Sequence, residues 1–203
     1  MIAGRRVTVL GAVLAAGLLG ACSAAPAAPS ATVLAGSPVP VATEESPGAT
    51  AATLAPGGPA WLAEPLIDVR TGAPVRLGDL VGHVVFVEGM ATWCPPCLEQ
   101  QHEAEIALSQ LPSGMVIYVS VDIDPREAAS TLSAYVDRNQ FGWQFLLATP
   151  AFLRELSDTF GATILSPPAT PVVVIDMSGH GTLTEIGIKR ASRLIELAHA
   201  LGA

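Results

Sequence analysis

Hydrophobic residues follow two alternating patterns over residues 61–203. Short runs rich in Val, Ile and Leu indicate strands, whereas longer stretches with apolar residues three or four positions apart indicate helices. The predicted strands are 66–69, 74–77, 84–88, 115–121, 143–147, 171–176 and 182–188. The predicted helices are 95–110, 124–139, 149–160 and 191–201. Strands that alternate with helices, followed by a hairpin and a last helix, imply an α/β fold with a mixed central sheet flanked by helices.

Local signals set several boundaries of these elements. Asp124, Pro125 and Glu127 supply a capping residue, a first-turn proline and an acid at the third position, so a helix should start at Asp124. Gly161 should end helix 149–160. The turn 71–73 should join the first two strands, and 77–82 should form a loop or a brief helical turn.

The first 22 residues have the pattern of an export signal. Arg5 and Arg6 precede an unbroken apolar stretch, 7–21, which is short for a membrane span. The ending LGAC at 19–22 resembles the bacterial lipoprotein signal, in which the cysteine receives lipid and becomes the mature N-terminus. That resemblance implies a lipid anchor at Cys22 and a position on the extracytoplasmic face of a bacterial membrane. The alternative is an ordinary signal anchor with an incidental cysteine.

Composition divides the rest of the chain in two. Residues 23–60 are dominated by Ala, Pro, Ser, Thr and Gly, and such a segment cannot bury enough apolar surface to fold. We therefore predict a signal peptide at 1–21, a lipidated cysteine with a flexible linker at 22–60, and one domain at 61–203. Without the signal, 8 Lys+Arg remain against 18 Asp+Glu, a formal charge of −10, which disfavours nucleic-acid binding.

With Cys22 assigned to lipid, only two cysteines are left, and they lie in the sequence ATWCPPC at 91–97. Cys94 and Cys97 follow an apolar strand and open a helix, where unpaired N–H groups and the helix dipole stabilise a thiolate. Pro95 suits the first helical turn, and Pro96 stiffens the ring. A disulfide between close-spaced cysteines encloses too small a loop to stabilise a fold, so a catalytic role is the better interpretation.

Four stretches carry a resemblance to a known family. They are the strand–turn–strand leading into LGDLVGH at 77–83, ATWCPPC at 91–97, VSVD at 119–122 and Thr170-Pro171 before an apolar strand. Together they resemble the thioredoxin superfamily, specifically its exported TlpA/ResA-like thiol–disulfide oxidoreductases, over nearly all of 63–203. The resemblance implies a thioredoxin-like fold with an N-terminal strand–turn–strand extension. The joint pattern is far more specific than a CxxC alone.

The resemblance also implies the role of each site residue. Cys94 would be the attacking nucleophile, and Cys97 the resolving thiol beneath it. Pro171, in a cis peptide after Thr170, would face the dithiol and leave the Thr170 backbone free to pair with an extended client peptide; Pro167 and Pro168 are the alternatives for holding this loop. Substrate contacts would come from five residues: Trp93, Pro95, Pro96, Thr170 and Pro171. Many relatives carry Glu three residues after the second cysteine, where this chain has Gln100.

Glu88 is a candidate proton acceptor because it lies six residues before Cys94 near the end of an apolar strand. At this position thioredoxins place a buried Asp. Burial should raise the pKa of a carboxyl toward the range useful for proton transfer, and Glu88 could then accept the proton of Cys97. The alternative is a strand-end carboxylate that reaches water or pairs with an arginine.

By resemblance, the protein reduces disulfides in client proteins with cysteine pairs, such as apocytochrome c or the copper-site subunits of an oxidase. An upstream membrane thiol–disulfide reductant would supply the electrons. We expect a monomer without a metal or cofactor other than the redox-active disulfide.

Two other classes of function are alternatives to this interpretation. Sco copper chaperones share the fold and a stretch like 122–125, and two thiolates plus an imidazole can hold copper. Those proteins take their histidine from the loop before the late strand, yet 161–171 contains none. The four histidines of the chain are interpreted as surface, loop or solvated helix residues: His83, His102, His180 and His199. A noncatalytic tethered binding module is the third class, and it would not need an intact WCPPC.

Overall fold

A seven-stranded sheet in the order β2-β1-β5-β4-β3-β6-β7 forms the centre of the fold. The computed structural model describes residues 58–203, so the predicted signal peptide, Cys22 and the linker up to residue 57 lie outside the described residues. Strands β3, β4 and β5 are parallel, and the other neighbours pair antiparallel. The strands are β1 Leu66–Asp68, β2 Pro74–Val75, β3 Val84–Met90, β4 Val116–Asp122, β5 Gln144–Leu147, β6 Val172–Ile175 and β7 Gly181–Leu183.

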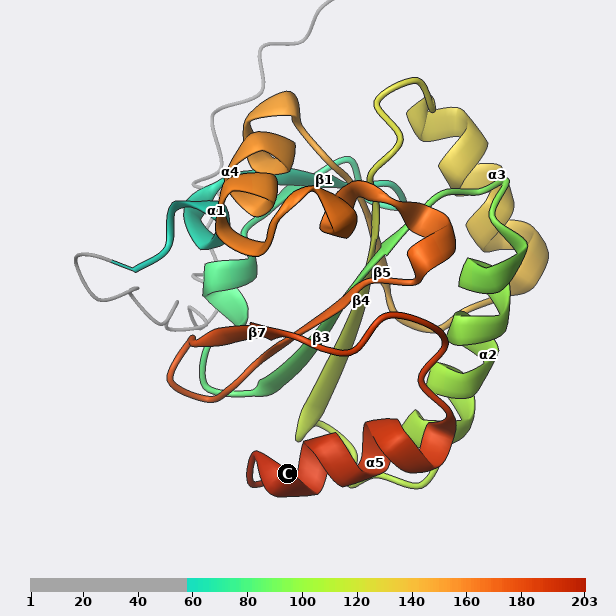
Figure 1. Cartoon of the computed structure of the whole chain (residues 1–203). Helices are drawn as coiled ribbons and strands as arrows, with labels where there is room; N and C mark the ends of the chain where they lie inside the picture. The colour runs from blue at the N-terminus through green and yellow to red at the C-terminus, as the bar shows by residue number, and fades with distance from the viewer. Residues whose placement is uncertain (1–57) are drawn as a thin grey trace, which may run out of the picture. The chain divides into compact units, whose positions relative to one another are not determined.

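Helices cover both faces of this sheet (Figure 1). The α-helices are α1 Ala60–Ala63, α2 Pro95–Leu108, α3 Ala129–Asn139, α4 Pro150–Phe160 and α5 Ala191–Ala200. Short 3₁₀ helices are η1 Leu77–Leu80, η2 Ala162–Leu165 and η3 Pro167–Ala169. Helices α2, α3 and α5 lie on one face, and α1 and α4 on the other. Within residues 58–203, no helix has the length and apolar character needed to cross a membrane.

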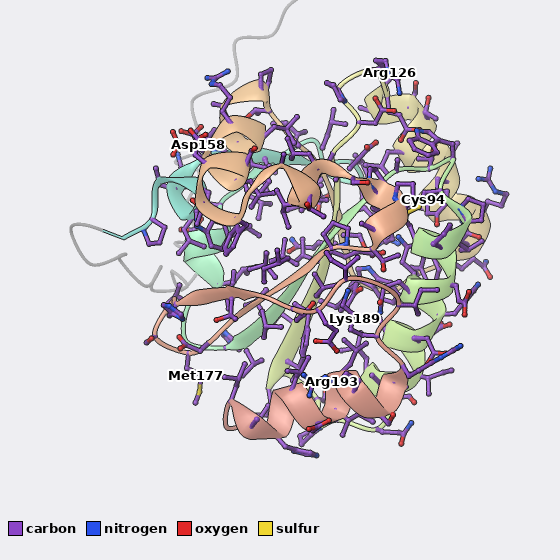
Figure 2. All side chains as sticks on the ribbon, viewed as in Figure 1. Cys94, Arg126, Asp158, Met177, Lys189 and Arg193 are labelled. Carbon is purple, nitrogen blue, oxygen red and sulfur yellow. A yellow bond between two sulfur atoms is a disulfide. The ribbon has the colours of Figure 1, made fainter. Side chains whose placement is uncertain are left out.

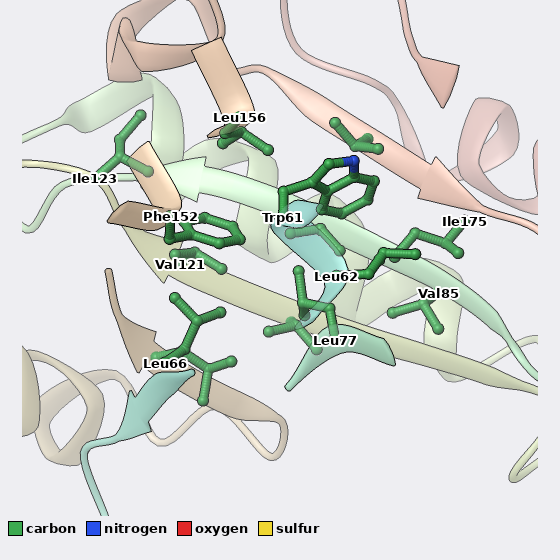
Figure 3. Close-up of a cluster of buried hydrophobic side chains, with 14 of the residues drawn as sticks. Trp61, Leu62, Leu66, Leu77, Val85, Val121, Ile123, Phe152, Leu156 and Ile175 are labelled. Atoms are coloured by element: carbon green, nitrogen blue, oxygen red, sulfur yellow. The ribbon is translucent and has the colours of Figure 1, made fainter. Parts of the chain in front are cut away.

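Side chains alternate across β3 and divide the core into two layers. Val85 and Val87 face the layer under α1 and α4, where Trp61 and Phe152 are buried (Figure 3). Val84 and Phe86 face the opposite layer, under α2 and α5. All seven residues of β3 are buried, as expected for a strand covered on both faces.

The structure confirms the predicted mixed sheet flanked by helices and the strand–turn–strand before it. The predicted helix start at Asp124 is wrong, because α3 begins at Ala129. The Asp124 carboxylate accepts hydrogen bonds from Arg126 and does not cap a helix. The predicted strand 182–188 is also too long, because pairing in β7 ends at Leu183. Helix α1 was not predicted, and its Trp61 is only 1% exposed.

The topology gathers several loops at one end of the sheet. Parallel strands β3 and β4 end there at Met90 and Asp122. The chain turns after β3 and enters α2 at Pro95, while the segments 123–128 and 161–171 lie beside that turn. The carboxyl ends of parallel strands are the usual place for functional loops in open α/β sheets. The predicted dithiol therefore lies where the fold places a site.

Candidate redox site

Cys94 and Cys97 form a disulfide at the start of α2, with 5.3 Å between their Cα atoms. Cys94 is the N-cap residue, and its Sγ accepts a hydrogen bond from the Cys97 backbone N–H at 3.2 Å. Pro95 and Pro96 fill the first helical turn, where N–H groups would have no partner in the helix. Unlike the Cys94 sulfur, the Cys97 Sγ lies next to an acceptor, 3.3 Å from the Pro167 carbonyl oxygen. One sulfur thus faces a donor and the other faces an acceptor.

Two carboxylates fix the residues just before the disulfide. The Trp93 side chain is half exposed, and its indole Nε1 donates to Asp124 Oδ2 at 2.9 Å. Asp124 also accepts from the guanidinium of Arg126, which holds the pKa of that carboxyl well below its usual range. Glu127 accepts from both the backbone N–H and the hydroxyl of Thr92. The segment after β4 therefore sets the position of the active-site turn.

The loop 167–171 covers the other side of the disulfide. The Pro171 carbonyl accepts from the Gly89 N–H at 2.9 Å, and a Cβ on Gly89 would lie only 3.2 Å from the Pro171 ring. The backbone of Thr170 is not free, contrary to what the family resemblance implies. Its N–H donates to the Pro167 carbonyl at 2.8 Å, and its carbonyl accepts from Lys189 Nζ. A client that pairs at Thr170 must share or displace these bonds.

Glu88 lies beneath the site and is fully buried. Its Oε2 accepts from the Ser120 hydroxyl at 2.9 Å and from the Gln101 amide at 3.2 Å. Its Oε1 has no hydrogen-bond partner among the described residues. Burial raises the pKa of Glu88 to about 8, although hydrogen bonds from Ser120 and Gln101 oppose that rise. Glu88 is shielded from bulk solvent, and the donors to its carboxyl within residues 58–203 are Ser120 and Gln101 rather than an arginine, so it is not an exposed strand-end carboxylate.

A second buried carboxyl, Asp122, ends β4 with an exposed fraction of 1%. Its Oδ1 accepts from the Asp124 N–H at 3.0 Å. Burial and the neighbouring carboxylates of Glu127 and Asp124 raise its pKa to about 8. Its environment therefore favours the protonated carboxyl, and one of the neighbours responsible is the Glu127 carboxylate that holds Thr92.

Lys189, just before α5, is buried on the same side of the sheet as the disulfide (Figure 2). Its Nζ donates to the carbonyls of Thr170 and Gly187. Gln100 on α2 binds both backbone groups of Lys189: Oε1 accepts from its N–H at 2.7 Å, and Nε2 donates to its carbonyl at 3.1 Å. A glutamate at position 100 could not donate the second of these bonds. Gln100 is thereby explained as a link between α2 and the segment before α5.

A groove of about 330 Å³ lies beside the disulfide. The turn before α2 and the segment after β4 contribute to it, together with η2 and η3. Its lining residues are Trp93, Ile123, Asp124, Pro125, Arg126, Leu165 and Pro167. The lining thus includes the exposed indole of Trp93 and Pro167 of the loop 167–171.

The histidines do not gather at the site. His102 lies on α2, where it packs edge-on against Phe141, with 5.5 Å between the ring centroids. Over residues 58–203, no three His, Cys, Asp or Glu side chains cluster closely enough to hold a metal ion.

The sequence matches no protein-family model and no curated protein. The structure, however, is similar to solved thioredoxin-like proteins. A secreted Mycobacterium tuberculosis disulfide oxidoreductase, described as homologous to Escherichia coli DsbE, is 16% identical with a TM-score of 0.56; the match covers 70% of this chain and 98% of that one. A thioredoxin-family thiol:disulfide interchange protein from Chlorobium tepidum is 19% identical, with a TM-score of 0.52 and coverage of 68% and 92%. A thioredoxin-related protein from Neisseria meningitidis is 22% identical, with a TM-score of 0.55 and coverage of 66% and 98%. The chain therefore has a thioredoxin-like fold.

Among the predicted residues, Trp93, Pro95 and Pro96 lie next to the disulfide in the chain, and Pro167, in the loop that leads to Thr170 and Pro171, contacts Cys97. Sequence reasoning missed several of their partners, which are Gln101, Ser120, Asp122, Glu127 and Lys189. One signal was available, since Lys189 is the only lysine in the sequence. The others are ordinary polar residues whose burial becomes evident only in three dimensions.

The raised pKa values of Glu88 and Asp122 predict a pH dependence of stability. Each carboxyl binds a proton more tightly in the folded protein, so the free energy of unfolding should fall as pH rises from about 4.5 to about 8. Each unit of pKa difference is worth about 1.4 kcal/mol. Glu88→Gln and Asp122→Asn should each remove more than about 1 kcal/mol of this fall.

Urea unfolding of the oxidised protein from pH 5 to pH 9 measures this slope. The exposed Glu105→Gln variant is the matched control and should keep the wild-type slope. A wild-type slope that persists in the Glu88→Gln, Asp122→Asn double variant would show that these carboxyls are not the source.

Proposed function

We propose that this protein is a membrane-tethered, extracytoplasmic thiol–disulfide oxidoreductase that reduces disulfides in client proteins. The observation that carries the proposal is the unequal environment of the two sulfurs. The Cys94 Sγ faces a backbone N–H at the start of α2, and the Cys97 Sγ faces a carbonyl oxygen. A donor stabilises a thiolate, whereas an acceptor favours the protonated thiol. Cys94 is thus suited to attack the client disulfide, and Cys97 is suited to remain protonated until it resolves the mixed disulfide.

The reaction is a pair of thiol–disulfide exchanges. In the reduced protein, the Cys94 thiolate attacks one sulfur of a client disulfide, forms a mixed disulfide and releases the other client sulfur as a thiolate. Cys97 then loses its proton and attacks the Cys94 sulfur. This step forms the Cys94–Cys97 disulfide and releases the second client thiolate. Two electrons pass to the client, and a membrane thiol–disulfide reductant restores the dithiol.

The groove beside the disulfide is the proposed client site. Trp93 is 51% exposed there, which is unusual for a tryptophan. The Pro167 carbonyl lies at the opposite edge, next to Cys97. An extended segment on either side of a client cysteine would contact Trp93, Pro95 and Pro96 on one side and the loop that carries Thr170 and Pro171 on the other.

Glu88 is the proposed proton acceptor for Cys97. It is the buried acid beneath the site, and its pKa of about 8 suits proton transfer near neutral pH. Gln101, which binds Glu88, lies one helical turn after Cys97 on α2. No hydrogen bond joins Glu88 and Cys97 in the described residues, so a water molecule would relay the proton.

The export signal and the linker support the extracytoplasmic part of the proposal. LGAC at 19–22 fits a lipoprotein signal, and the predicted linker, 23–60, would separate the domain from the membrane. Clients are expected to expose cysteine pairs. The resemblance to TlpA/ResA-like proteins suggests apocytochrome c or the copper-site subunits of an oxidase. The negative charge of the mature chain favours protein clients over nucleic acid.

We expect Cys97→Ser to trap clients as mixed disulfides, because the thiolate that normally releases them is missing. Affinity capture of the full chain from its host, followed by reduction and mass spectrometry, identifies the clients and the linked cysteine. Cys94→Ala is the matched control and should trap none. Equal trapping by the two variants would show that the sulfurs do not have divided roles.

Glu88→Gln should leave the first attack near the wild-type rate and slow the release of the client about tenfold or more at pH 8. Release in the wild type should rise through about pH 8, as Glu88 loses its proton. Single-turnover kinetics with a disulfide peptide across pH separates the two steps. Release that is unchanged at every pH would reduce Glu88 to a structural residue.

The mature N-terminus should be Cys22 carrying lipid. Mass spectrometry of the chain extracted from membranes measures this directly. Cys22→Ser should yield a chain without the lipid mass. An unmodified Cys22, or a different N-terminus, would contradict the anchor.

A further inference from the structure

Lys189 is the only lysine of the 203-residue sequence, in which the other nine basic side chains are arginines. It is also 1% exposed. Lysine almost always keeps its ammonium group in water, because burying an unpaired charge costs far more than burying an apolar group. A buried lysine needs specific partners, and those partners indicate its role.

The ammonium of Lys189 is held by two loop carbonyls. It donates to the Thr170 carbonyl and, at 2.7 Å, to the Gly187 carbonyl. The Gly187 N–H in turn donates to the Ala169 carbonyl at 3.0 Å, so the same two segments are joined twice. Gln100 fixes the Lys189 backbone from α2. Lys189 therefore connects the active-site helix to the loop that ends at Thr170.

Thr170 has a backbone that needs such support. Its φ of 44° and ψ of 56° lie in the left-handed region, which is unfavourable for an L-residue. Threonine is β-branched, and a residue before proline normally avoids helical conformations. Thr170 is also fully buried, so its carbonyl cannot bind water instead. Lys189 supplies the partner that this conformation requires.

We propose that Lys189 is a positioning residue of the redox site: by binding the Thr170 carbonyl, it holds the 167–170 loop against Cys97. The Thr170 N–H donates to the Pro167 carbonyl at 2.8 Å, and this same oxygen lies 3.3 Å from the Cys97 Sγ. A reduced Cys97 held in this way donates its S–H to Pro167 and keeps its proton until the client has been attacked. This role of Lys189 rests on the proposed function, in which Cys97 is the resolving thiol.

The charge of Lys189 would act on Cys97 in the opposite direction. Two carboxyls face the ammonium, Glu88 from β3 and Glu185 from the segment after β7, and both oppose the effect of burial, which lowers the pKa of Lys189 to about 8. A cation near Cys97 would stabilise its thiolate and lower its pKa. The Pro167 carbonyl, as an acceptor 3.3 Å from the sulfur, would instead favour the protonated thiol. Positioning and charge are therefore distinguished by the sign of the change when Lys189 is replaced.

The test measures the pH dependence of Cys97 alkylation by iodoacetamide in the full chain carrying Cys94→Ala, with the Cys97 peptide quantified by mass spectrometry. Adding Lys189→Met, which keeps most of the side-chain length without the ammonium, should lower the midpoint by about one unit. That shift corresponds to about tenfold faster alkylation at neutral pH. Arg154→Met, which removes an exposed cation of α4 on the opposite face of the sheet, is the matched control and should leave the midpoint unchanged. An unchanged or raised midpoint in Lys189→Met overturns the proposal.

A second measurement on the wild-type chain decides the case if Lys189→Met does not fold. Because Lys189 is the only side-chain amine, an acylating reagent followed by peptide mass spectrometry reports on it alone. Native Lys189 should react at least tenfold more slowly than in urea; an equal rate overturns the proposal. Neither experiment requires disulfide exchange. A wild-type chain that does not reduce a disulfide peptide would contradict the proposed function while leaving the contact between Lys189 and the loop testable.

Discussion

Two adjacent glutamines on the buried side of α2 hold the site together. Gln100 binds the backbone of Lys189, and Gln101 donates to Glu88 and accepts from the Tyr135 hydroxyl. These bonds fix the dithiol helix to β3, to α3 and to the segment before α5. A glutamine amide can donate and accept at once, so Gln100 binds both backbone groups of Lys189 and Gln101 joins Glu88 to Tyr135, which an ionised carboxylate could not do. The position of the disulfide therefore depends on the hydrogen bonds of these two fully buried glutamines.

The two sulfurs differ because different parts of the chain reach them. The N–H that faces Cys94 belongs to the start of α2, so any CxxC that opens a helix would have it. The carbonyl that faces Cys97 comes from Pro167, 70 residues later in the chain. Local sequence thus determines the reactive sulfur, whereas the tertiary fold determines the environment of the resolving one. This division explains why a motif alone predicts reactivity better than it predicts mechanism.

The same distinction between local and tertiary effects explains which features of the fold and site could be predicted from the sequence. The strands β3, β4 and β6 and the helix after Cys94 were predicted because long apolar runs and a proline-rich helix start are strong local signals. The helix start at Asp124 failed because the carboxylate binds Arg126, two residues on, and also holds Trp93. That competition depends on a residue 31 positions away, which no local pattern contains. The burial of Glu88 could be expected from its strand, but its partners could not.

Unsatisfied polar atoms concentrate where the site is. Within residues 58–203, the buried side-chain atoms without a hydrogen-bond partner include Glu88 Oε1, Asp122 Oδ2 and Thr170 Oγ1. Each such atom costs about 1–3 kcal/mol, and the left-handed Thr170 adds to this. Among the described residues of the apolar layer under α1 and α4, only the Trp61 indole N–H is buried without a hydrogen-bond partner. The apolar face of the sheet therefore stabilises the fold. The opposite face is destabilised by the burial of two carboxyls and an ammonium near the disulfide, and the apolar face offsets that cost.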